Sequence, residues 1–108
     1  MNAALRLLAT GGALPGRTVT NEDLSRMVDT SDEWIVGRTG IHQRLIAQEE
    51  TTTDLATKAA AQALERSGLA PEEIGLVVCA TVTPDTSVPM VAANVKRGLG
   101  IERAAAFD

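Results

Sequence analysis

Aromatic side chains are nearly absent from this 108-residue sequence, which contains one tryptophan, one phenylalanine and no tyrosine. Apolar residues still make up 44% of the chain, so any core must consist of leucine, valine, isoleucine and alanine, which are commonly buried. We therefore expect a closely packed but thin core. The length of the chain allows one compact domain at most.

Cysteine is equally scarce, and the single one, Cys79, lies within the apolar run 76–80. A single cysteine excludes an intrachain disulfide and a cysteine-based metal cluster. Because apolar surroundings disfavour the thiolate, we expect a raised thiol pKa and a structural role for Cys79 instead of a nucleophilic one. This use of cysteine suits a reducing cytoplasm.

Long apolar runs and blocks of positive charge are also missing. Arg6 interrupts the apolar residues at 1–8, and no signal-peptide core or stretch of about 20 apolar residues follows. The net charge is −4, with acidic and basic residues interspersed, which leaves no cationic surface for nucleic acid or anionic lipid. The sequence therefore predicts a cytoplasmic protein that binds neither nucleic acid nor membrane.

Helix start and stop signals are the clearest patterns that the sequence does contain. A hydroxyl cap followed by acidic residues occurs at 20–23 and again at 30–33, and predicts the start of two short helices. The second helix should end at Gly40. The apolar face predicted for the first helix comprises Leu24, Met27 and Val28.

A longer helix is predicted from 54 to 67, introduced by three threonines and closed by Gly68, with apolar residues at helical spacing. Many of these residues are alanines, so this helix should pack closely against a neighbour and be buried or nearly buried. Pro89 suits the first turn of a further helix, which should end near Gly98 or Gly100.

Four segments are predicted to be extended, at 3–10, 41–47, 74–82 and 104–107. The run 74–82 is β-branched and almost uncharged, as expected for a central strand covered on both faces. Strands that alternate with helices predict an α/β fold, with a mostly parallel sheet flanked by helices. Because the sequence stops on an apolar strand, we expect it to be part of a longer chain.

Several strings, taken in order, resemble those of the β-ketoacyl-acyl-carrier-protein synthase III family of thiolase-fold condensing enzymes. The longest and most specific is VDTSDEWIVGRTGI at 28–41. The others are GGALP at 11–15, TNEDL at 20–24, IGLVVCAT at 74–81, VP at 88–89 and AFD at 106–108. The resemblance covers essentially the whole chain. It implies that 1–108 is an incomplete N-terminal half-domain of a thiolase-like fold, ending just before the family's nucleophile turn.

The resemblance implies chemistry that the composition does not show. Family members, usually homodimers, transfer the acyl group of an acyl-CoA, typically acetyl-CoA, to a cysteine. They then condense it with malonyl-acyl-carrier protein to initiate fatty-acid synthesis. The acyl-CoA is a substrate, and neither a cofactor nor a metal is implied. The family's catalytic cysteine lies a few residues beyond the match to 107–108, and its histidine and asparagine lie much later. We therefore expect no catalytic residue in this chain and no activity of the chain alone.

Trp34 and Arg38 are the strongest candidate site residues. They are four residues apart, so on a helix they share one face and form a platform for a flat anionic ligand. The resemblance implies that they flank the adenine of CoA, with Thr30 and Thr39 nearby. From the residues alone, the alternatives are packing of Trp34 and helix capping by either threonine.

Val88 lies where family members place a residue that reaches across the dimer interface into the partner's acyl pocket; packing under Pro89 is the alternative. His42 has no cysteine, aspartate or glutamate at ligand spacing, so a surface position is expected. Two other functions remain open. One is a relative that uses another primer in polyketide or secondary-metabolite synthesis, and the other is a non-catalytic module that binds CoA or dimerises.

Overall fold

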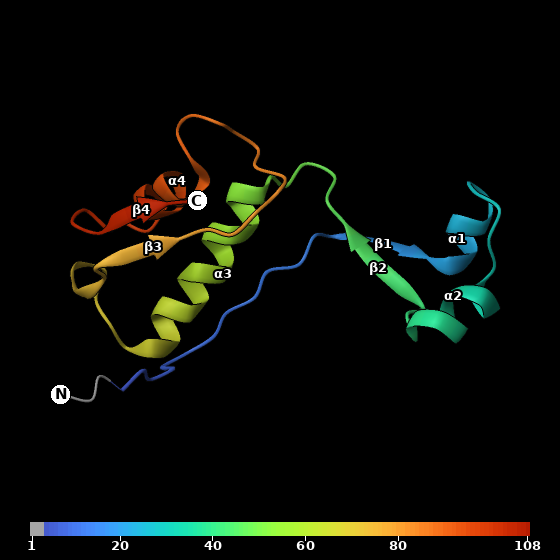
Figure 1. Cartoon of the computed structure of the whole chain (residues 1–108), viewed down its shortest axis with the longest axis horizontal. Helices are drawn as coiled ribbons and strands as arrows, with labels where there is room; N and C mark the ends of the chain where they lie inside the picture. Colours follow the sequence, from blue (N-terminus) through green and yellow to red (C-terminus); the bar gives the residue numbers. More distant parts are fainter. Residues whose placement is uncertain (1–3) are drawn as a thin grey trace. The chain divides into compact units, whose positions relative to one another are not determined.

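The computed structural model describes residues 4–108, which fall into two compact units (Figure 1). Residues 14–50 form the hairpin unit, and residues 51–108 with the segment up to Ala13 form the two-helix unit. That both belong to a single half-domain stays a prediction. No helix in the described part of the chain is long and apolar enough to cross a membrane.

The hairpin unit is built on two short antiparallel strands, β1 (Arg17–Thr20) and β2 (Gln43–Ile46). Two helices, α1 (Asn21–Ser25) and α2 (Asp32–Thr39), lie between these strands in the sequence. Among the residues of this unit only Val19 and Asn21 are buried. Apolar packing alone therefore does little to fix the helices on the strands.

Both helices of this unit begin where the capping signals predict, and α2 also ends at the predicted Gly40. Thr20 and Asp23 form a reciprocal capping box at the start of α1. At the start of α2, the Ser31 hydroxyl accepts a hydrogen bond of 3.1 Å from the Trp34 amide. Gly40 ends α2 in the left-handed conformation, with φ at 69°, which glycine adopts without strain.

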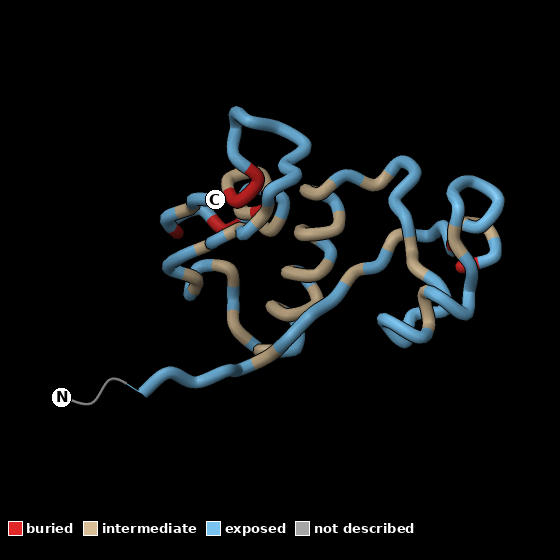
Figure 2. Tube along the Cα trace, turned by 45° about the vertical axis from the view of Figure 1, so that its right-hand side comes forward, coloured by how far each residue is buried: buried red, intermediate tan, exposed pale blue. Residues whose placement is uncertain are grey.

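The two-helix unit contains α3 (Thr52–Ser67), the 3₁₀ turn η1 (Pro71–Glu73), β3 (Leu76–Val78), α4 (Val91–Gly98) and β4 (Ala105–Phe107). The strands β3 and β4 pair in parallel, and α4 packs against both strands and against α3. Buried residues gather on α4 and in the segment that follows it (Figure 2). They are Val91, Ala92, Val95, Ile101 and Ala104. The core of this unit is therefore centred on α4.

The expected mostly parallel sheet is wrong for the residues described. They form two separate two-stranded sheets, of which β1–β2 is antiparallel and β3–β4 is parallel. The sequence gives no sign of β1, because Arg17–Thr20 is too short and too polar to show a strand pattern of its own. Residues 4–10 of the strand predicted at 3–10 form no strand, and Ala3 lies outside the described residues. The fold is a mixed α/β segment.

Burial is also lower than the sequence predicts. No residue of α3 is buried, so the predicted buried helix is half-buried on one face only. The predicted central strand at 74–82 is reduced to Leu76–Val78, and its end residues are 52% and 55% exposed. Within the described residues β3 has a single neighbouring strand, β4, so its other edge has no strand partner. The apolar face predicted for α1 is wrong too, because α1 ends at Ser25 and Met27 and Val28 are exposed.

The start of α4 differs from its prediction, whereas its end at Gly98 agrees. Pro89 precedes the helix, and Met90 occupies the N-cap position without a side-chain hydrogen bond. The free amides of the first turn instead donate to the carboxylate of Asp108, from Val91 at 2.9 Å and from Ala92 at 2.7 Å. A cap supplied from 16 residues away leaves no local sequence signal.

Candidate functional site

The helix α2 carries both of the strongest candidate residues. Trp34 lies in its first turn and Arg38 in its last turn, four residues apart. That spacing places them on the same face of the helix. The position of Arg38 in the last turn is also favourable, because a cation near the C-terminal end of a helix interacts favourably with the helix dipole.

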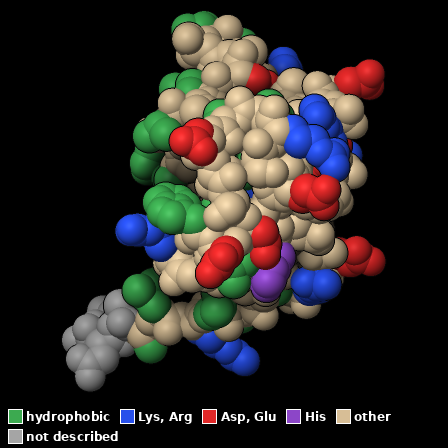
Figure 3. All heavy atoms as spheres, turned by 90° about the vertical axis from the view of Figure 1, so that its right-hand side faces the viewer, with side chains coloured by type: hydrophobic (Ala, Val, Ile, Leu, Met, Phe, Trp, Pro, Cys, Tyr) green, Lys and Arg blue, Asp and Glu red, His purple; other side chains and the backbone are tan. Residues whose placement is uncertain are grey.

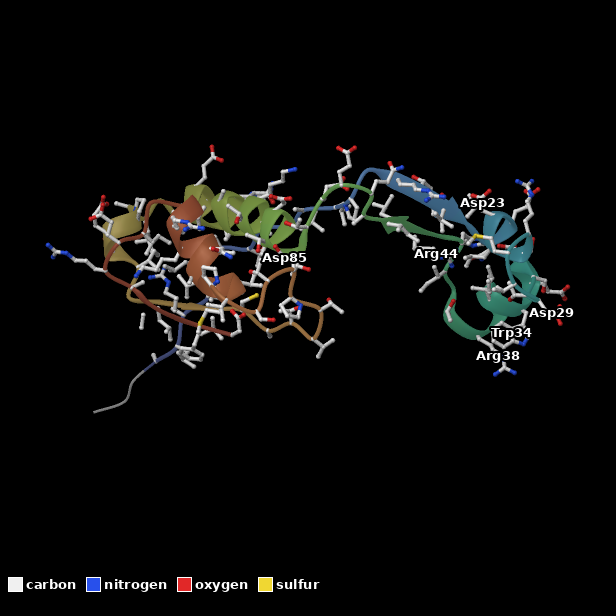
Figure 4. The ribbon with its side chains drawn as sticks, turned by 90° about the horizontal axis from the view of Figure 1, so that it is seen from above. Asp23, Asp29, Trp34, Arg38, Arg44 and Asp85 are labelled. Atoms are coloured by element: carbon white, nitrogen blue, oxygen red, sulfur yellow. The ribbon has the colours of Figure 1, made fainter. Side chains whose placement is uncertain are left out.

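The structure brings the Trp34 and Arg38 side chains together (Figure 4). The Arg38 guanidinium carbon lies 4.7 Å from the centre of the indole ring, within the range of a cation–π interaction. Trp34 is 57% exposed, so packing does not explain its position. Among the described residues Arg38 forms no ion pair. The pair therefore offers an open aromatic surface beside an unneutralised positive charge.

Thr30 lies beside this pair. Together with Asp29, Ser31 and Trp34 it lines a shallow hollow of about 360 Å³. Hydroxyl groups, an indole face and a nearby guanidinium suit a ligand that combines a flat ring with hydrogen-bonding groups and anionic charge. The Asp29 carboxylate disfavours an anion placed directly against it, so the anionic charge of a ligand is better placed beside the Arg38 guanidinium, which stacks on Trp34 at the hollow.

Thr39 is engaged in a different way. Its hydroxyl donates to the Ile35 carbonyl at 2.8 Å and accepts from the Ile41 amide at 3.1 Å. Both bonds satisfy backbone groups at the end of α2, so the structure supports the capping alternative for this residue. The structure therefore groups Trp34, Arg38 and Thr30, and leaves Thr39 as a residue that shapes the end of their helix.

Asn21 is a residue that the sequence analysis missed. It is 1% exposed, and its side-chain amide nitrogen donates to Asp32 Oδ1 at 2.8 Å and to the Ile41 carbonyl at 2.7 Å. Its Oδ1 accepts from Arg44 Nη2 at 2.7 Å. The only signal in the sequence is an asparagine directly after a helix cap, and it does not identify partners 11 to 23 residues away.

Val88 lies in the two-helix unit, on the loop before α4, and is 89% exposed. Hydrogen bonds join this loop to α3 and to α4. Asp85 Oδ1 accepts from the Thr53 amide at 2.9 Å and from the Thr53 hydroxyl at 2.8 Å. On the other side of Val88, the Pro89 carbonyl accepts from the Thr86 hydroxyl at 2.8 Å and from the Asn94 side-chain amide at 3.4 Å. An apolar side chain is thus held in solvent by anchors on either side of it.

Cys79 and His42 fit the structural positions expected of them. Burial, and secondarily the charges of Asp108 and Asp85, raise the pKa of the Cys79 thiol, as the sequence predicts. His42 is exposed beside acidic side chains (Figure 3), with its Nδ1 3.7 Å from Asp32 Oδ1. Within residues 4–108 no three histidine, cysteine or acidic side chains are grouped as a metal site requires.

Comparison with protein-family models gives no match, but individual proteins match closely. A β-ketoacyl-[acyl-carrier-protein] synthase III of Rhizorhabdus wittichii is 54% identical over 103 residues, which are 94% of this chain and 32% of that protein. A protein of the same name from Symbiobacterium thermophilum is 56% identical over 99 residues, covering 91% of this chain and 30% of the relative. The crystal structure of the Aquifex aeolicus 3-oxoacyl-[acyl-carrier-protein] synthase III superposes with a TM-score of 0.90 at 48% identity, over 94% of this chain and 33% of that one.

The chain belongs to the β-ketoacyl-acyl-carrier-protein synthase III family and matches its N-terminal third.

The synthase III family is one of thiolase-like condensing enzymes of fatty-acid biosynthesis. The chain spans about a third of the length of the curated relatives that it matches. A priming β-ketosynthase of the R1128 polyketide pathway is also similar, with a TM-score of 0.91 and 38% identity over 95% of this chain and 31% of that protein. The family resemblance drawn from the string at 28–41 is confirmed.

Proposed function

We propose that this chain supplies the CoA-binding wall of a cytoplasmic β-ketoacyl-acyl-carrier-protein synthase III that condenses an acyl-CoA primer, typically acetyl-CoA, with malonyl-acyl-carrier protein. The observation that carries the proposal is the exposed Trp34 ring with the Arg38 guanidinium 4.7 Å from its centre. An indole stacks on adenine, while a guanidinium binds phosphate through paired hydrogen bonds. Thr30 lines the same hollow and contributes a hydroxyl, and Thr39 acts by completing the helix.

A titration of the chain with CoA tests this proposal. Trp34 is the single tryptophan, so its fluorescence reports directly on the site, and calorimetry measures binding for Trp34→Ala. Arg38→Ala should weaken binding by roughly 2- to 30-fold, which is the range expected for a cation–π and phosphate contact. Arg26→Ala is the matched control, because Arg26 is an exposed arginine of the same unit that pairs with Glu22 and Asp23. Absence of CoA binding, or an equal loss in the control, would contradict the proposal.

We further propose that the chain alone does not catalyse condensation and that the intact synthase acts as a homodimer. Its single cysteine has a raised thiol pKa, whereas a nucleophilic cysteine needs a lowered one. Val88 is the residue proposed to reach the partner's acyl pocket, and its 89% exposure on an anchored loop supports a contact with another surface. Incubating the chain with acetyl-CoA and malonyl-acyl-carrier protein should give no ketoacyl product, and product formation would contradict this proposal.

A synthase with another primer is the second candidate function. It is favoured by the similarity to the R1128 priming β-ketosynthase, whose structure superposes with a TM-score of 0.91. Comparing acyl-CoA primers of increasing length in a full-length synthase that carries this segment would separate the two. Preference for acetyl-CoA supports fatty-acid initiation, and preference for a longer primer supports the polyketide-type alternative. Binding of CoA by the chain, without chemistry in any longer protein, would favour the non-catalytic module instead.

A further inference from the structure

The helix that carries Trp34 and Arg38 has little apolar support. None of the eight residues of α2 is buried. Isolated helices of fewer than about 12 residues are marginal in water, and an eight-residue helix gains its fixed position from tertiary contacts. The orientation of the Trp34–Arg38 pair therefore depends on whatever attaches α2 to the rest of the hairpin unit.

Among the described residues, one buried side chain forms hydrogen bonds at both ends of α2. The Asn21 amide nitrogen donates one hydrogen bond to Asp32 Oδ1, at the first residue of α2, and another to the Ile41 carbonyl, directly after the glycine that ends α2. The two distances are 2.8 Å and 2.7 Å. Asn21 thus contacts α2 at both of its ends. The asparagine carboxamide offers two donors from one nitrogen with an acceptor oxygen beside them.

Asn21 is in turn fixed to the strands. Its backbone amide donates to the His42 carbonyl at 3.0 Å, and its Oδ1 accepts from Arg44 Nη2 at 2.7 Å. Arg44 also donates to the Val19 carbonyl at 3.2 Å, which joins β2 to β1. Because every polar atom of the Asn21 side chain has a partner, its burial is tolerated. A chain of hydrogen bonds therefore connects the two strands, through Asn21, to both ends of α2.

We propose that Asn21 is a positioning residue that holds α2 at both ends and thereby orients Trp34 and Arg38 for the nucleotide. We call the two hydrogen bonds from Asn21 to Asp32 and to the Ile41 carbonyl the clamp. The identity of the ligand rests on the proposed function, whereas the clamp rests on these hydrogen bonds alone. Asn21 acts through Asp32 and the end of α2 and does not contact the ligand.

Asp32→Ala tests the clamp with little risk to folding, because the Asp32 side chain is 58% exposed. Removing a carboxylate near the site should favour an anionic ligand on electrostatic grounds. Loss of the clamp predicts the opposite, a roughly 2- to 10-fold weaker affinity for CoA, as expected for one hydrogen bond. The sign of the change therefore distinguishes positioning from charge. Asp32→Asn removes the charge but keeps an acceptor oxygen, and should bind CoA at least as tightly as the unmodified chain.

Glu33→Ala is the matched control, since Glu33 lies in the same acidic first turn but accepts no hydrogen bond from Asn21. It should bind CoA as the unmodified chain does or slightly more tightly. Asn21→Ala should weaken binding more than Asp32→Ala does, because it releases both ends of α2. If Asn21→Ala fails to fold, the Asp32 series decides the question alone. Unchanged or tighter binding by Asp32→Ala would overturn the proposal.

Fluorescence anisotropy of Trp34, measured without ligand, separates this inference from the proposed function. Asp32→Ala should lower the anisotropy, because the indole gains mobility when α2 is released, and Asp32→Asn should restore it. If the unmodified chain binds no CoA, the proposed function fails, and lower anisotropy in Asp32→Ala still supports the clamp. Unchanged anisotropy in Asp32→Ala would overturn the clamp whether or not CoA binds.

Discussion

At the scale of single residues, Glu50 makes the stability of the hairpin unit depend on pH. Its carboxylate accepts the Gln48 amide at 3.0 Å and the Gly16 amide at 3.0 Å, so it joins the segment before β1 to the segment after β2. Hydrogen bonds from the amides of Gln48, of Glu50 itself and of Gly16 lower the pKa of this carboxyl from 4.5 to about 2. The ionised carboxylate is therefore favoured in the folded chain.

The stabilisation by Glu50 should be complete above its ordinary pKa of 4.5 and lost as the pH falls toward about 2. Urea unfolding followed by Trp34 fluorescence should show a decline in the free energy of unfolding across this range, with a smaller decline in Glu50→Gln. Glu49→Gln is the matched control, because the neighbouring Glu49 side chain accepts no hydrogen bond within the described residues. Equal declines in the unmodified chain and Glu50→Gln would contradict the prediction.

Cys79 offers a second test at this scale. Because burial and nearby negative charge raise the pKa of its thiol, the folded chain should alkylate slowly with iodoacetamide at neutral pH. The alkylation rate of the folded chain should rise at a higher pH than the alkylation rate of the urea-unfolded chain. Mass spectrometry of the alkylated chain across pH 7 to 10 measures both profiles. Coincident profiles would contradict the structural role assigned to this cysteine.

At the scale of elements, the packing of the N-terminal segment on α3 depends on a glycine. A Cβ atom at Gly11 would collide with the Ala59 carbonyl oxygen and lie 2.7 Å from the Ala63 amide nitrogen, whereas a Cβ at Gly12 would meet nothing within 4 Å. Gly11→Ala should therefore lower the free energy of unfolding by about 1–3 kcal/mol, as overpacking does. Gly12→Ala should leave it nearly unchanged. Urea unfolding of both variants measures the difference, and equal effects would contradict the predicted close approach.

The elements that the sequence predicts well are those specified within a few residues. The helix α2 begins within the capping pattern at 30–33 and ends at Gly40, as expected, and the i, i+4 spacing of Trp34 and Arg38 places both on one face. Such caps and spacings are local and leave a pattern in the sequence. The spacing predicted that Trp34 and Arg38 share a face, whereas their choice as candidate site residues came from the family resemblance of the string at 28–41.

The elements that the sequence does not predict depend on distant partners. β1 exists because its backbone pairs with β2, and α4 begins at Val91 because the Asp108 carboxylate caps it. The role of Asn21 depends on Asp32, Ile41 and Arg44, which reach it from other elements. The prediction that the strand at 74–82 is buried is wrong for a related reason. The segments that cover a strand come from elsewhere in the chain, and the residues of the strand do not specify them.

At the scale of the whole molecule, apolar surface is left open in the two-helix unit. It includes an apolar groove of about 450 Å³ lined by the segment 6–9, α3, β3 and α4. Leu76 lies in this groove, 52% exposed.

The groove should make the folded chain bind the dye ANS, whose fluorescence reports exposed apolar surface. Leu76→Ser should reduce the ANS signal, because it replaces an apolar side chain of the groove by a polar one. Val82→Ser is the matched control, since Val82 is 97% exposed but lies outside the groove, and a lone apolar side chain in solvent does not form a dye site. An ANS signal that both substitutions reduce equally, or no signal at all, would contradict the prediction that the groove binds the dye. A signal lost only with Leu76 would locate the uncovered apolar surface of the chain on the α3–β3–α4 side of the two-helix unit.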